Sequence, residues 1–89
     1  KIRAIGEKIS NEAYNFFKKD KTGFEACQIQ SKISKIFDIA LRTSPEDFWK
    51  SVENIDRYSY SFDKQLNNIK KIAVLLDNSE RQFLGIEDS

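Results

Sequence analysis

Histidine is absent from this 89-residue chain, and cysteine, proline and glycine are scarce. Without histidine, the chain lacks the usual general base at neutral pH and the commonest metal ligand in proteins. The same absence excludes serine or cysteine triads of the ordinary kind and the Glu-x-x-His di-iron sites of helical bundles. We therefore expect no enzymatic activity, no catalytic residue, no cofactor and no metal site.

The few cysteines and glycines exclude further classes of site. The single cysteine, Cys27, can form neither an intrachain disulfide nor a cysteine-based metal site. The three glycines, Gly6, Gly23 and Gly85, are isolated, so no glycine-rich loop can cradle a phosphate. No apolar stretch approaches the ~20 residues that a membrane-spanning helix needs. Methionine is also absent, so we interpret the chain as a processed form or a fragment, and its compartment stays open.

Composition indicates one folded domain over residues 1–89. Apolar residues make up 39% of the chain and charged residues 33%, which is typical of globular rather than disordered proteins. Fifteen basic and fourteen acidic side chains leave a formal net charge of +1. Because this charge is so small, no strong overall field attracts nucleic acid or anionic lipid. A chain of this length can bury only a marginally adequate core.

The clearest pattern in the chain is an apolar line in its C-terminal half. Its positions alternate spacings of four and three residues, namely Phe48, Val52, Ile55, Ser59, Phe62, Leu66, Ile69, Ala73 and Leu76. This spacing predicts one helix face packed against other helices, with the narrow width of a coiled-coil seam. Ser59 is its one polar member: the hydroxyl either bonds back to the helix backbone or sets register with a partner.

Local signals place the ends of this long helix. Ser44 as cap, with Pro45 at the first helical position, predicts a start at residue 45. The pattern continues to Asp77. Two serines and two tyrosines at 58–61 are poor helix formers, so the helix over 45–77 is either continuous or broken there.

Apolar periodicity predicts two earlier helices, over residues 2–19 and 23–42. Their core lines are Ile2, Ile5, Ile9, Ala13 and Phe16, with Phe17 beside them, and then Ala26, Ile29, Ile33, Ile36 and Ala40, with Phe37 and Leu41 beside them. Thr22 and Glu25 form a capping-box pattern at the second start.

A second capping-box pattern, Ser79 to Gln82, opens a short helical turn over residues 80–84, and Gly85 closes it. The predicted fold class is all-α: a small up-down bundle of three to four helices, the last one long or kinked near Ser59.

The leading functional hypothesis is a non-catalytic protein-binding bundle of the inhibitor, immunity, adaptor or surface ligand-binding type. A seam longer than its neighbouring helices favours a protein partner or self-association. Trp, Tyr and Arg dominate interface hot spots. The candidate partner-binding residues, which lie off the apolar line, are Trp49, Lys50, Arg57, Tyr58 and Tyr60. Core contacts with neighbouring helices are the alternative for these aromatic residues.

Two other hypotheses stay open. The chain could bind nucleic acid through Lys18, Lys19, Lys21, Lys32, Lys35 and Arg42. The first three of these form a basic patch at the end of the first helix, where cations also simply complement the helix dipole. Alternatively, the chain is an oligomerisation domain of a larger polypeptide.

Overall fold

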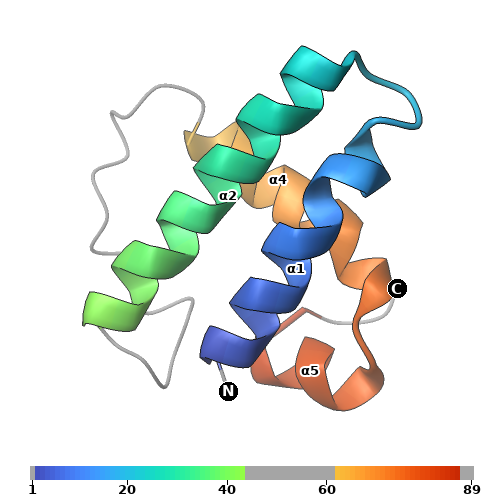
Figure 1. The fold of residues 1–89 in the computed structure, drawn as a ribbon. Coiled ribbons are helices and arrows are strands. Elements are labelled where there is room, and N and C mark those ends of the chain that lie inside the picture. The colour runs from blue at the N-terminus through green and yellow to red at the C-terminus, as the bar shows by residue number, and fades with distance from the viewer. Residues whose placement is uncertain (1, 44–61, 87–89) are drawn as a thin grey trace.

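The computed structural model describes residues 2–43 and 62–86, and all regular structure within these ranges is helical. Helices α1 (Ile2–Phe17) and α2 (Gly23–Thr43) run antiparallel, and α4 (Phe62–Ile72) passes behind them (Figure 1). The 3₁₀-helix η1 (Ala73–Leu75) leads into the short helix α5 (Asn78–Phe83). The predicted all-α bundle is confirmed. None of the described helices combines the length and apolar composition that crossing a membrane requires.

The core forms where the apolar faces of α1 and α2 meet and α4 covers them. The periodic residues of both helices are buried as predicted, except that Leu41 is only half-buried and that two residues exchange roles at the end of α1. There Phe17 is buried, whereas Phe16 is only half-buried against the core. The α1 and α2 members of the core are Ile2, Ile5, Ile9, Ala13, Phe17, Ala26, Ile29, Ile33, Ile36, Phe37 and Ala40.

The turn between α1 and α2 is short and held by its own hydrogen bonds. Helix α1 ends at Phe17, two residues before the predicted end, and the Lys18 amide donates to the Tyr14 carbonyl at 2.9 Å. The Thr22 hydroxyl then accepts from the Glu25 amide at 3.1 Å. This is the first of the two bonds of the predicted capping box. The turn therefore fixes where the lysines between the helices lie.

Helix α4 buries a wider face than the predicted seam. Ile69 and Ala73 are buried as predicted, but Ile72 is fully buried too and Leu66 is only half-buried. Two amides, Gln65 and Asn68, share this face, each 4% exposed. A pattern that counts only apolar residues assigns Gln and Asn to the solvent side of a helix. It therefore misjudges which side of α4 faces the core.

The predicted helix end at Asp77 is wrong. The α-helix ends at Ile72, tightens into 3₁₀ geometry over Ala73–Leu75, and gives way to extended backbone at Leu76 (φ −89°, ψ 153°). The physical reason is that Asp77 caps the next helix, and a capping residue adopts extended rather than helical backbone angles. Leu76 nevertheless remains buried, at 4% exposure.

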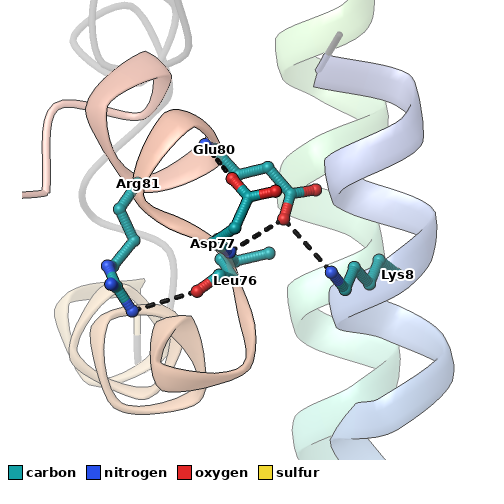
Figure 2. A network of polar contacts seen from close by, with 5 residues as sticks. All are labelled: Lys8, Leu76, Asp77, Glu80 and Arg81. Carbon is teal, nitrogen blue, oxygen red and sulfur yellow. Dashed lines mark hydrogen bonds and ion pairs between the residues drawn. The ribbon is translucent and has the colours of Figure 1, made fainter.

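A polar network fixes α5 against α1 (Figure 2). Asp77 Oδ1 accepts from the Glu80 amide at 2.8 Å, and the Asp77 amide donates to Glu80 Oε1 at 3.0 Å. The same Glu80 oxygen pairs with Lys8 Nζ of α1 at 3.1 Å. Arg81 Nη1 donates to the Leu76 carbonyl at 3.0 Å. One carboxylate therefore both caps α5 and links it to α1.

This network corrects the predicted start of the last turn. The capping box is Asp77 with Glu80, two residues before the predicted Ser79 and Gln82 pair. Asp is as good a cap as Ser. Asp77 lies two residues after the end of η1, so the capping box begins α5 almost directly after η1. Gly85 ends the helix with φ 72°, and the Ile86 amide donates to the Arg81 carbonyl at 2.9 Å. This is the glycine stop that the sequence predicts, and it leaves Leu84 fully buried.

Candidate functional site

The predicted aromatic and basic partner-binding residues are Trp49, Lys50, Arg57, Tyr58 and Tyr60, and all of them lie outside the described residues. The predicted break at 58–61, the role of Ser59 and the start at Pro45 lie there as well. These stay predictions, and the candidate site is therefore built from the lysines of the described helices.

The predicted basic patch of Lys18, Lys19 and Lys21 lies at the end of α1 and in the turn that follows it. The Lys18 ammonium lies 5.3 Å from the centre of the Tyr14 ring. The Lys19 ammonium lies 5.9 Å from the centre of the Phe16 ring, which stacks edge-on against Phe17. Cation–π contacts of this kind hold a lysine stem over an aromatic face. Lys19 and Lys21 line the same hollow, whereas Lys18 does not.

The first hollow lies between the start of α2 and the start of α4. Its volume is about 190 Å³, and we name it the amide hollow, because the buried Gln65 side chain lines it. Lys21 comes from the turn, Lys32 from α2 and Lys64 from α4. The complete lining is Lys21, Glu25, Gln28, Ile29, Lys32, Lys64 and Gln65. Three cations from three elements therefore surround this hollow, with one acid among them.

The second hollow lies at the end of α1, and we name it the aromatic hollow. Its lining is Phe16, Phe17, Lys19, Asp20, Lys21 and Lys71. Two phenylalanines provide its apolar part. Lys71 comes from α4, so this hollow also joins α4 to the α1–α2 turn. Apolar and basic groups are combined here.

Lys21 lines both hollows and joins them into one surface. We define the lysine face as Lys19, Lys21, Lys32, Lys64 and Lys71. Lys64 and Lys71 are seven residues apart, which places them on one side of α4, roughly 10 Å apart along its axis. Asp20 and Glu25 are the acids in the same lining. The local balance is therefore basic, although the whole chain is nearly neutral.

Gln65 is the buried polar group in this surface. Its side-chain oxygen accepts from Asn68 Nδ2 at 3.2 Å, and both side chains are 4% exposed. Within residues 2–43 and 62–86, nothing accepts from the Gln65 amide nitrogen. A buried amide donor is normally hydrogen-bonded to protein or water. This donor therefore remains available to a group in the amide hollow.

Exposed apolar side chains follow Lys71 along the chain, in η1. Val74 is 67% exposed and Leu75 is 40% exposed. Val74 follows Lys71 by three residues, so both lie on the same side of the helix, with Leu75 adjacent. Phe24, at the start of α2, is also exposed, at 74%, but lines neither hollow.

Other surfaces offer less chemistry. A groove between α1 and α2 mixes both charges, with Arg3, Glu7 and Asp38 among its lining residues. Within the described ranges, no group of three metal-binding side chains gathers. Cys27 is exposed.

The sequence prediction missed Lys64, Gln65 and Lys71. The seven-residue spacing of the two lysines is a usable signal that they share a face. Which helices this face approaches depends on how α4 crosses α1 and α2, and local pattern carries no information on that. Comparison of the chain with protein families, with curated proteins and with solved structures finds no match.

Proposed function

We propose that this protein is a non-catalytic protein-binding module that engages an acidic polypeptide through the lysine face and the adjacent Val74 and Leu75. The observation that carries the proposal is the junction of apolar and basic groups at the aromatic hollow. Phe16, Lys19 and Lys71 line that hollow, and the exposed Val74 in η1 follows Lys71 by three residues.

The apolar part supplies affinity. Burying a side chain such as Val or Leu against a partner contributes about 1.5–3 kcal/mol relative to leaving it exposed. Val74, at 67% exposure, has most of this contribution still available. Fixed apolar anchors surrounded by charged groups are the usual anatomy of a protein interface.

The basic part supplies specificity. Lysines around an apolar centre attract an acidic partner and orient its approach. The lysine face collects five cations against two acids, Asp20 and Glu25, in the same lining. The lack of histidine in the sequence supports a non-catalytic role.

The same arrangement is less suitable for a nucleic acid backbone. Of the residues named for that hypothesis, Lys35 and Arg42 are exposed but line neither hollow. Asp20 and Glu25 share the linings with the lysines and repel a continuous row of phosphates. The predicted partner contacts of Trp49 and Tyr58 would form a second part of the proposed interface.

The test places a photo-crosslinking amino acid at position 74 of the full chain and exposes it to extract from the native source. We expect an acidic polypeptide to be crosslinked. The charge reversal Lys19→Glu with Lys71→Glu should abolish the crosslink. The matched reversal Lys35→Glu with Arg42→Glu carries the same change in net charge and should leave it intact.

Three outcomes contradict the proposal. One is capture that is equal for the two reversals, because the lysine face would then have no role. Another is capture that nuclease abolishes, which favours the nucleic-acid hypothesis. The third is crosslinking only to a second copy of this chain, which favours the oligomerisation domain. Circular dichroism of each variant verifies that the bundle remains folded.

A further inference from the structure

The amide hollow has a feature that a general basic surface does not require. Its three lysines come from three separate elements, the turn, α2 and α4. Their side chains therefore start from three separate backbone segments rather than from one helix face. A small anion in the hollow can be approached from several sides at once.

Gln65 provides the second, independent observation. This side chain is 4% exposed and lines the hollow, with its oxygen already bonded to Asn68. Its amide group is the donor that remains. A ligand oxygen in the hollow would replace water on a donor that is bonded to no other described residue.

We propose that the amide hollow is a binding site for a phosphate monoester or inorganic phosphate, held by Lys21, Lys64 and the Gln65 amide. The monoester dianion offers three terminal oxygens, so it can accept from donors that converge from different directions. A carboxylate has two oxygens in one plane and pairs best with the planar fork of arginine. The volume of about 190 Å³ is several times the ~30 Å³ share of one water, so the anion fits together with bridging waters.

Glu25 distinguishes a discrete phosphate from a nucleic acid strand. Its carboxylate lies in the wall of the hollow and repels any phosphate, but a strand that passes through must cross this wall, whereas one bound dianion need not approach it. A single dianion contacts the lysines on the other walls. The site does not depend on the proposed function, since the phosphate can be free or attached to a phosphorylated side chain of a partner.

The experiment follows the full chain by ¹H–¹⁵N NMR during titration with sodium phosphate at constant ionic strength. The side-chain NH₂ signals of Gln65 should shift saturably. Lys64→Gln should weaken binding about tenfold, because it removes one charge-assisted hydrogen bond. The control Lys35→Gln removes the same charge from an exposed position of α2 and should change the affinity less than twofold, an order-of-magnitude limit for screened surface charges.

Measuring the affinity at several pH values tests whether the protonation of the ligand controls binding. The second pKa of a phosphate monoester is about 6. The chain has no histidine to titrate near this pH. With a phosphoserine peptide as the ligand, affinity should therefore fall severalfold between about pH 7.5 and pH 5.5 as the dianion gains a proton. Sulfate keeps its charge over this range and should show no such change.

The source of the phosphate is decided by a third comparison. A phosphoserine peptide that binds more tightly than inorganic phosphate supports the site and assigns the phosphate to a partner. Equal affinity supports the site and assigns free phosphate. The proposal is overturned if the Gln65 signals do not move, or if shifts are linear and spread over all lysine-rich segments. It is also overturned if acetate displaces phosphate at equal concentration.

Discussion

Gly6 occupies a position where the addition of one methyl group should destabilise the fold. A Cβ built at Gly6 would lie 2.9 Å from both Cδ1 and Cγ of Phe37. Carbon atoms normally pack at about 3.5–4.0 Å. Phe37 is only 3% exposed, so its ring has little room to withdraw. The close approach of α1 to α2 at this point therefore requires glycine.

Two opposing effects set the magnitude of Gly6→Ala. Alanine is favoured over glycine in a helix interior by about 1 kcal/mol, which would stabilise α1. Overpacking a well-filled core costs about 1–3 kcal/mol. We expect the steric cost to win, with a net loss near 1 kcal/mol, because the contact is to a buried ring rather than to a flexible side-chain end. For a domain of this size, that loss lowers Tm by about 4–8 °C.

Urea denaturation followed by far-ultraviolet circular dichroism measures the change. Ala4→Gly, at an exposed position of the same helix, gives the local propensity difference without a contact to Phe37. A double-mutant cycle with Phe37→Leu should show that Gly6→Ala costs less when the ring is absent. The reasoning is refuted if Gly6→Ala stabilises the chain by as much as Ala4→Gly destabilises it.

Two further predictions concern polar groups of the core and of α5. Glu80→Ala should cost about 1 kcal/mol in unfolding free energy, because it removes one half of a capping box. Lys8→Ala should cost less than about 0.5 kcal/mol, because the pair with Glu80 is a surface ion pair whose side chains are 46% and 23% exposed; equal losses would refute this order. Asn68→Leu should cost about 1–3 kcal/mol by leaving the Gln65 oxygen without its donor. The double replacement Gln65→Leu with Asn68→Leu should cost less than the single one, and thermal unfolding of the two variants checks this.

The helices α1 and α2 could be predicted from the sequence because their determinants are local. Isoleucines at helical spacing define both buried faces, and Thr22 marks the start of α2. The last turn was predicted for a similar reason, since Gly85 is a local stop signal. The start of this turn was misplaced because the sequence offers two capping boxes. Asp77 is followed three residues later by Glu80, and Ser79 is followed three residues later by Gln82. The choice between them depends on where η1 ends.

The face of α4 could not be predicted in the same way. Gln65 and Asn68 are polar by composition and buried in the structure, at 4% exposure each. Their burial is tolerated because they bond to each other, and this pairing appears only once both are placed against the core. The seam through Ile69 and Ala73 was correct. The buried face of α4 differs from the predicted one because the pattern counted Gln65 and Asn68 as solvent-facing.

In the candidate site, too, the residues that are close in sequence could be predicted, and those brought together by the fold could not. Lys19 and Lys21 were singled out because they are close in sequence, and the structure brings Lys64 and Lys71 to them only through the crossing of α4. The α1–α2 turn is held by its own hydrogen bonds, and α4 presents its two lysines on one side. Lys21 is consequently placed between them by the fold itself. Core packing fixes the backbone positions from which these lysines start, which is why we assign function to these hollows rather than to lysines elsewhere on the helices.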